Sequence, residues 1–139
     1  MVAYNKFEDF VEALCIAEHV ITTDSFELAL TNAANAPVAS NTILANLTVI
    51  TYTNLNSPFV LTTSTASETS GTFTLLFADE TISASGGAGN GFRYVCIFNQ
   101  TTTTPDDNLM GWYDYGSDLA LADGESLLVD WTTSTWTLV

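Results

Sequence analysis

The sequence predicts a mainly β fold: an antiparallel β-sandwich or jelly-roll-like barrel with one N-terminal α-helix. Three observations favour this class. Segments of alternating apolar and polar residues recur after residue 22, turn-forming residues separate them, and a single segment has helical periodicity. No alternation of strands with helices supports a parallel sheet. At 139 residues, the chain (1–139) is expected to form one domain.

The predicted helix covers about residues 5–19, "NKFEDFVEALCIAEH". Asn5 followed by Glu8 is a variant of the capping box, and the acidic first turn suits the positive end of the helix dipole. The apolar residues that share one side of this helix at a spacing of three to four are Phe7, Phe10, Val11, Leu14 and Ala17.

The predicted strands follow in order along the rest of the chain. In "SFELALT", Phe26, Leu28 and Leu30 alternate with Glu27 and Ala29, as in a strand with one buried face. Turn-rich segments such as "NAANAPVASN", "SGGAGNG" and "TTTTPDDN" separate the strands. The strands are expected at residues 25–31, 47–53, 71–78, 90–100, 109–116, 125–131 and 134–139.

The charge balance excludes several partners. Two Lys or Arg residues stand against 16 Asp and Glu, for a formal charge of −14. Binding to nucleic acid or to an anionic membrane needs clustered cations, so neither is expected; solubility is the expected use of the charge. No secretory signal or membrane span is recognisable, which predicts synthesis in the cytoplasm. Cys15 and Cys96 are expected to be buried thiols, although a bridge between them stays open.

No sequence pattern predicts catalysis, a cofactor or a metal, and the chain is not expected to be an enzyme. The glycine-rich segment 85–91 lacks the spacing and the lysine of a phosphate loop and is expected to be a surface loop. His19 stands without a recognisable nucleophile and is expected at the end of the helix or on a half-buried face. The acidic turns at Asp79–Glu80 and Asp106–Asp107 lack a calcium-loop pattern.

Aromatic residues gather in "GWYDYGSD", residues 111–118. Trp112, Tyr113 and Tyr115 are a candidate platform on which a sugar could stack. Alternation places Tyr113 and Tyr115 on one face of the strand and Trp112 with Asp114 on the other. We favour the interpretation that one face belongs to the core and the other supports a polar contact.

Arg93 is half of the cationic charge and lies in the apolar strand "NGFRYVCIFNQ". Alternation predicts that it shares a face with Val95 and Ile97, opposite Phe92. An Arg among apolar neighbours is costly unless it is paired. Asp114, isolated in another aromatic strand, is the predicted partner in a structural ion pair. A salt bridge between subunits is the alternative, and a catalytic Arg ranks third.

The chain resembles a group of small virion proteins of tailed bacteriophages. The resemblance rests on the order and spacing of segments over nearly the whole length, since each is structural by itself. The segments are "YNKFEDFVE", "LALTNAANAPVASN", "SGGAGNGFRYVCIFN", "DNLMGWYDYG" and "LADGESLLVDW". The resemblance implies a capsid decoration (cement) protein that binds the major capsid protein on the assembled head, commonly as a homotrimer. It also implies a place on the virion surface after synthesis in the host cytoplasm.

Further expectations concern assembly. The N-terminal segment, with Tyr4, Phe7 and Phe10, is expected to contribute to the assembly contact. A tail or neck component is one alternative. A carbohydrate- or receptor-binding module is another, and it would require exposed rings at Trp112, Tyr113 or Tyr115.

Overall fold

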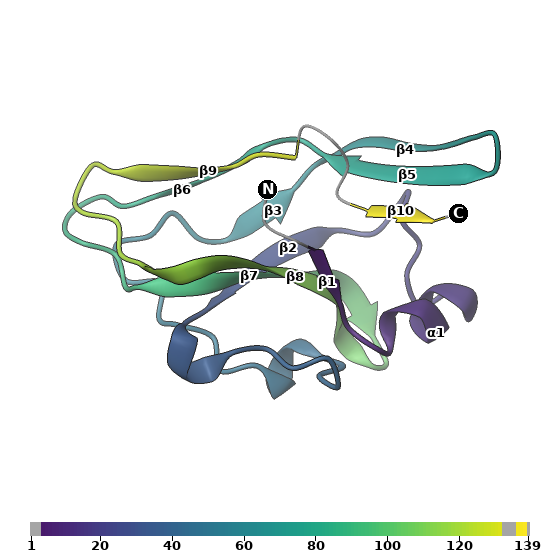
Figure 1. The fold of residues 1–139 in the computed structure, drawn as a ribbon, viewed down its shortest axis with the longest axis horizontal. Coiled ribbons are helices and arrows are strands. Elements are labelled where there is room, and N and C mark those ends of the chain that lie inside the picture. The colour runs from purple at the N-terminus through teal and green to yellow at the C-terminus, as the bar shows by residue number, and fades with distance from the viewer. Residues whose placement is uncertain (1–3, 132–135, 139) are drawn as a thin grey trace.

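The computed structural model describes residues 4–131 and 136–138. The chain is mainly β and antiparallel with one short α-helix, which confirms the predicted fold class (Figure 1). The strands are β1 (Tyr4–Lys6), β2 (Phe26–Thr31), β3 (Phe59–Leu61), β4 (Thr63–Thr69), β5 (Thr72–Phe77), β6 (Glu80–Ser83), β7 (Phe92–Thr103), β8 (Asp106–Leu119), β9 (Ser126–Val129) and β10 (Trp136–Leu138). The helices are α1 (Phe10–Cys15) and the short 3₁₀ turns η1 (Ala33–Asn35) and η2 (Leu44–Asn46).

The described strands form three sheets. The largest has the order β1-β8-β7-β2-β3, and the others are β10-β5-β4 and β6-β9. In Figure 1 the two smaller sheets lie above the large one, and the segment with η1 and η2 lies below it. The arrangement is therefore sandwich-like, with the long β7–β8 hairpin in the middle layer.

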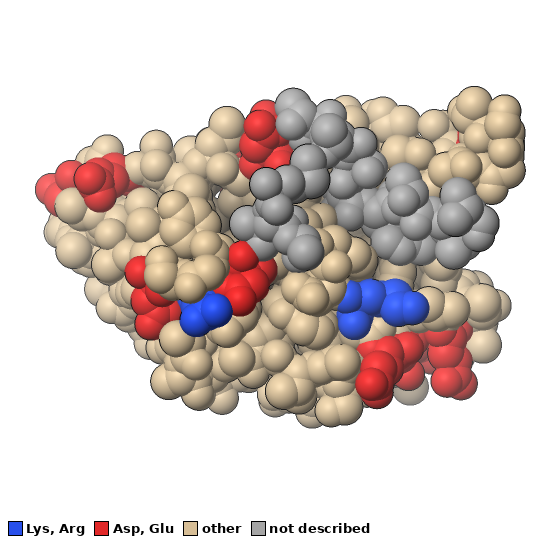
Figure 2. Space-filling model, viewed as in Figure 1, with Lys and Arg blue, Asp and Glu red and all other residues tan. Residues whose placement is uncertain are grey.

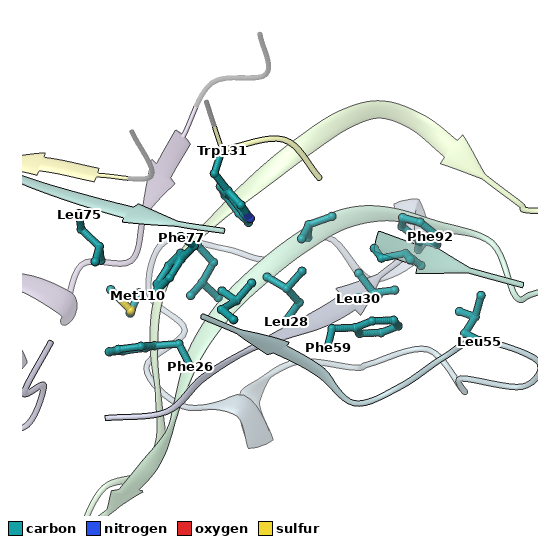
Figure 3. Close-up of a cluster of buried hydrophobic side chains, with 14 of the residues drawn as sticks. Phe26, Leu28, Leu30, Leu55, Phe59, Leu75, Phe77, Phe92, Met110 and Trp131 are labelled. Atoms are coloured by element: carbon teal, nitrogen blue, oxygen red, sulfur yellow. The ribbon is translucent and has the colours of Figure 1, made fainter. Parts of the chain in front are cut away.

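The main core fills the space between the large sheet and the smaller sheets. In Figure 3 the side chains of β2 and β5 point toward one another, with Phe26 near Phe77 and Leu28 between the layers. The Phe26 and Phe77 ring centroids are 5.7 Å apart, and Trp131 contacts Phe77 edge-on at 6.0 Å. Phe10 from α1 also belongs to this cluster. Such burial of large apolar side chains is the main favourable term in folding.

A second core lies on the opposite face of the large sheet. Its β7 members are Tyr94, Cys96 and Phe98, and Leu44 and Leu47 cover them from the segment with η2. Val95 and Ile97 point into the main core instead. Strand β7 is therefore buried on both faces, which explains its nearly continuous run of apolar residues.

The N-terminal segment departs from the predicted helix over 5–19. Residues 4–6 pair with β8 as β1, so Asn5 does not cap a helix, and α1 is limited to Phe10–Cys15. Gly111 makes room for this pairing, because a side chain there would overlap the Tyr4 ring. The helix ends where Ala17 takes a positive φ of 63°. Edge pairing with β8 thus overrides local helical periodicity.

Other strand predictions were correct or wrong for identifiable reasons. Strands β2, β5, β7, β8 and β9 occur where the alternation predicted them. The segment 47–53 is not a strand, and its Ile50 N–H donates to the Leu30 carbonyl at 2.9 Å. Its apolar side chains divide between the two cores: Leu47 and Val49 pack against the second core, and Ile50 and Tyr52 against the main core. The Leu30 N–H donates to the Tyr52 hydroxyl at 3.1 Å. This hydroxyl takes the place of the backbone carbonyl that a neighbouring strand would have supplied. Of the segment 134–139, residues 134–135 and 139 lie outside the described residues.

Three strands had no clear signal. The short strands β3 and β6 and the Thr-rich β4 were not predicted. Pairing with β2, β9 and β5 creates them, since their own alternation is weak.

Candidate interaction surfaces

The predicted ion pair between Arg93 and Asp114 is present within the chain. Arg93 Nε donates to Asp114 Oδ1 at 2.7 Å, and Nη2 donates to Oδ2 at 2.8 Å, which is a bidentate contact. The hydrogen bond from Arg93 lowers the pKa of Asp114. Asp114 also accepts from Gly116 N–H at 2.7 Å, and the Arg93 guanidinium carbon is 5.1 Å from the Tyr94 ring centroid. The pair therefore joins β7 to an irregular part of β8.

The predicted faces of β7 around Arg93 need a correction at Phe92. The register between β7 and β8 shifts between Phe92 and Tyr94: Phe92 pairs with Leu119, whereas Tyr94 pairs with Asp114. Phe92 consequently joins the main core together with Val95 and Ile97, instead of facing away from them. The extra residues of β8 absorb the difference, as in a β-bulge.

The candidate aromatic platform is not formed. The Trp112 ring packs on Phe7 at 4.6 Å in the second core, and Tyr113 contacts Trp131 at 5.5 Å in the main core. Tyr115 is 48% exposed and stands apart from them. The three rings therefore do not form the candidate platform, because those of Trp112 and Tyr113 pack against the cores on opposite faces of β8.

The N-terminal aromatic residues hold the chain together. Phe7 and Phe10 are fully buried within the chain, so neither side chain offers surface to a partner, and an assembly contact of the N-terminal segment stays a prediction. Tyr4 is half-buried, and its hydroxyl donates to the Met110 carbonyl at 3.1 Å. Burial raises the pKa of Tyr4 well above its usual value. These residues position α1 and its surroundings.

α1 and the segment that follows it expose apolar side chains, which we call the α1 patch: Val11, Cys15, Ile16 and Val20. Ile16 is 60% exposed, Val20 is 44% exposed and Val11 is 39% exposed. Val11 was expected on the buried side, but the inward residues of α1 are Phe10 and Ala13. Two exposed carboxylates, Glu8 and Glu12, accompany the patch. Exposed aliphatic residues this close together in the sequence make the segment a candidate for a protein contact.

The cysteines differ from each other. Cys15 is exposed, contrary to expectation, whereas Cys96 is buried as predicted. Burial raises the pKa of the Cys96 thiol to about 12, so this thiol stays protonated and unreactive at neutral pH. Both thiols are free.

Behind the α1 patch lies a buried polar cluster that the sequence did not predict. Asn99, fully buried on β7, donates from Nδ2 to Asp24 Oδ2 at 2.6 Å and lies 3.1 Å from His19 Nδ1. Asn108 on β8 donates to Glu18 Oε2 at 2.8 Å. The segment after α1 is thus tied to the β7–β8 hairpin by side-chain hydrogen bonds.

The cluster fixes the protonation state of His19. Asn99 Oδ1 accepts from Thr101 N–H at 3.0 Å, so the amide cannot be flipped and Nδ2 must face His19. Nδ1 of His19 is therefore an acceptor, and the neutral ring carries its proton on Nε2. Burial lowers the pKa of His19, although the carboxylates of Asp24, Glu18 and Asp9 oppose that shift. His19 was expected at the end of the helix or on a half-buried face; the structure buries it, with 3% exposed.

The remaining expectations from the sequence concern the glycine-rich segment 85–91, metal ligands and membrane-spanning helices. The segment 85–91 is a loop between β6 and β7, as predicted, and Gly86 N–H donates to Asp123 Oδ1 at 2.9 Å. Within the described residues, no three His, Cys, Asp or Glu side chains are grouped to hold a metal ion. In the same part of the chain, no helix has the length and apolar character needed to cross a membrane.

No protein-family model, curated protein or solved structure matches the chain. The functional interpretation therefore depends on the residues themselves. In Figure 2 the cationic side chains appear as small blue areas beside red carboxylates on a mostly neutral face.

Sequence reasoning missed the outward position of Val11, Ile16 and Val20 and the burial of Asn99. A helical projection centred on Phe10 and Ala13 would have placed Val11 and Cys15 together on the opposite side, next to Glu12. Nothing in the alternation marked Asn99 as buried, because a polar residue in a strand is usually read as facing solvent.

Proposed function

We propose that the chain is a structural protein of a bacteriophage virion, a decoration protein that binds the assembled head through the α1 patch. The observation that carries the proposal is the patch itself, with Ile16 at 60% exposure directly after a helix whose Phe10 and Ala13 are buried in the chain. The resemblance of the sequence to phage virion proteins supplies the virion context. The proposal assigns the chain no catalytic step.

The partner surface follows from the chemistry of the patch. Binding through Val11, Ile16 and Val20 requires an apolar surface on the partner. Only when both apolar surfaces are removed from water does their contact favour binding. Lys or Arg side chains of the partner, beside this apolar surface, would complement the exposed carboxylates of Glu8 and Glu12. The proposed partner is the major capsid protein, and the proposal requires that its surface have an apolar centre with Lys or Arg at its rim.

The buried cluster supports this role by making the patch rigid. His19, Asn99 and Asp24 hold the segment that follows α1, and Phe10 anchors the helix in the core. A surface that is ordered before binding loses little conformational entropy on contact. Copies repeated over a shell, for which we propose trimers, then add weak contacts into lasting attachment.

The proposal is tested by adding the purified chain to heads of the encoding phage that lack it and measuring co-sedimentation. Ile16→Asp is expected to weaken binding about tenfold or more, equivalent to about 1.4 kcal/mol. Leu128→Asp is the matched control, because Leu128 is 55% exposed on β9, away from α1, and should bind as the unchanged chain does.

Two outcomes would contradict the proposal. Equal binding of the Ile16→Asp and Leu128→Asp variants would remove the α1 patch as the contact. Binding to isolated tails or necks, but not to heads, would assign the chain to that part of the virion instead.

A further inference from the structure

A polar pocket lies beside the start of β7, separate from the α1 patch. Its volume is about 400 Å³, and Asn32, Asn35, Thr48, Thr51 and Asn90 line it, together with the neighbouring residues Val49, Ile50 and Gly91. The lining comes from three separate segments: the turn around η1, the segment over the second core, and the loop before β7. The size suits one or two sugar rings.

Internal hydrogen bonds engage three amides in this pocket. Asn35 Nδ2 donates to Asn32 Oδ1 at 2.9 Å, and Asn90 Nδ2 donates to the Thr51 carbonyl at 2.8 Å. The Thr51 carbonyl can only accept, so it assigns Nδ2 of Asn90, whereas the bond between Asn32 and Asn35 is satisfied equally if both amides are turned over. The atoms not used in these bonds are Oδ1 of Asn90 as an acceptor, and one amide nitrogen and one amide oxygen of the Asn32–Asn35 pair as a donor and an acceptor. The Thr48 and Thr51 side chains belong to exposed residues and add hydroxyls that can donate or accept.

The lining carries no charge, and this selects the ligand class. A metal ion would need carboxylates, and a phosphate would need cations or a row of N–H groups; none of the lining residues is ionisable. The net charge of −14 further disfavours anions. Fixed amide donors and acceptors beside hydroxyls match a molecule with adjacent hydroxyl groups, because each such group both donates and accepts.

We propose that this pocket binds a neutral saccharide unit. No aromatic ring is among the lining residues, so stacking does not contribute and the affinity for a single sugar is weak, with a Kd in the millimolar range. The site differs from the aromatic platform expected at Trp112, Tyr113 and Tyr115. It does not depend on the virion assignment, because it rests only on the lining residues.

The test is a titration of the full ¹⁵N-labelled chain with glucose, galactose, mannose or N-acetylglucosamine, followed by NMR of the Asn side-chain amides. Saturable shifts of the Asn32, Asn35 and Asn90 signals are expected with at least one sugar. Thr48→Val and Asn32→Ala should each weaken that response severalfold, whereas Thr53→Ala, an exposed change outside the lining, should leave it unchanged.

The Thr48→Val variant keeps the test interpretable, since Thr48 makes no hydrogen bond on which the fold depends among the described residues. Glycerol serves as a small polyol control. The proposal is overturned if none of the four sugars gives saturable shifts, if glycerol gives the same response, or if Thr48→Val and Asn32→Ala respond as the unchanged chain does.

Discussion

The two ends of β7 are held by polar contacts of different kinds. Near its start, Arg93 pairs with Asp114, and both side chains keep about a third of their surface exposed to solvent (29% and 34%). Near its end, Asn99 is fully buried and holds His19 and Asp24. Water screens the first contact, whereas the second lies in a medium where an unpaired polar group is costly.

This difference teaches that the ion pair of Arg93, although conspicuous in the sequence, matters less for stability than the hydrogen bonds of Asn99. The ion pair attracts notice because Arg93 is one of two cations in the chain. The Asn99 cluster contains an ordinary amide, yet it fixes a histidine tautomer and joins α1 to the hairpin. The two ends also carry the two proposed surfaces: the α1 patch lies by the Asn99 cluster, and the polar pocket lies by the residues that precede Phe92.

The largest expected effect comes from removing Asn99. The Asn99→Ala change deletes the donor to Asp24 and leaves Nδ1 of the buried His19 without its partner. We expect the free energy of unfolding to fall by about 3 kcal/mol, measured by urea denaturation. The neighbouring Gln100→Ala, whose side chain is exposed, should change it little. Similar losses for both variants would contradict the central place of Asn99.

A smaller effect is expected from the titration of His19. Because its pKa in the folded chain is below the usual value of 6.5, the unfolded chain takes up protons first. Stability is therefore fully present above pH 6.5 and falls as the pH drops below it toward the pKa of the folded state. Urea midpoints measured between pH 7 and pH 5 check this expectation. His19→Gln should flatten this part of the profile; an unchanged slope would exclude His19 as its source.

The smallest of the three effects on stability is expected at the ion pair. Arg93→Met should destabilise the chain less than Asn99→Ala does, and about 1 M NaCl should reduce the difference from the unchanged chain. The lowered pKa of Asp114 contributes stability that is lost only as the pH falls below 3.8. A loss at Arg93 that equals the loss at Asn99 and is insensitive to salt would reverse the comparison between the two ends.

The features that the sequence predicted have local signals, and those that it missed depend on contacts between distant segments. Strand β5 was predicted because its alternating Phe73, Leu75 and Phe77 pack against the main core, and β2 because its larger apolar residues alternate even though both of its faces are largely buried. The Arg93–Asp114 pair was predicted because each charge is alone in an apolar strand. The failures involve residues whose surroundings come from distant segments: Tyr4 pairs with β8 over Gly111, and Asn99 meets His19 across 80 positions of sequence. The spacing of apolar residues within one segment does not predict contacts with residues far away in the sequence.

The exposed Cys15 provides the most direct test of the account, because it lies within the α1 patch and Cys96 is buried. The measurement is the rate of maleimide labelling of Cys15, followed by mass spectrometry, in the free chain and on heads that carry it. We predict that attachment slows labelling at least about tenfold, as expected for a thiol within a buried contact. Equal labelling rates in the free and attached chain would contradict docking through the α1 patch.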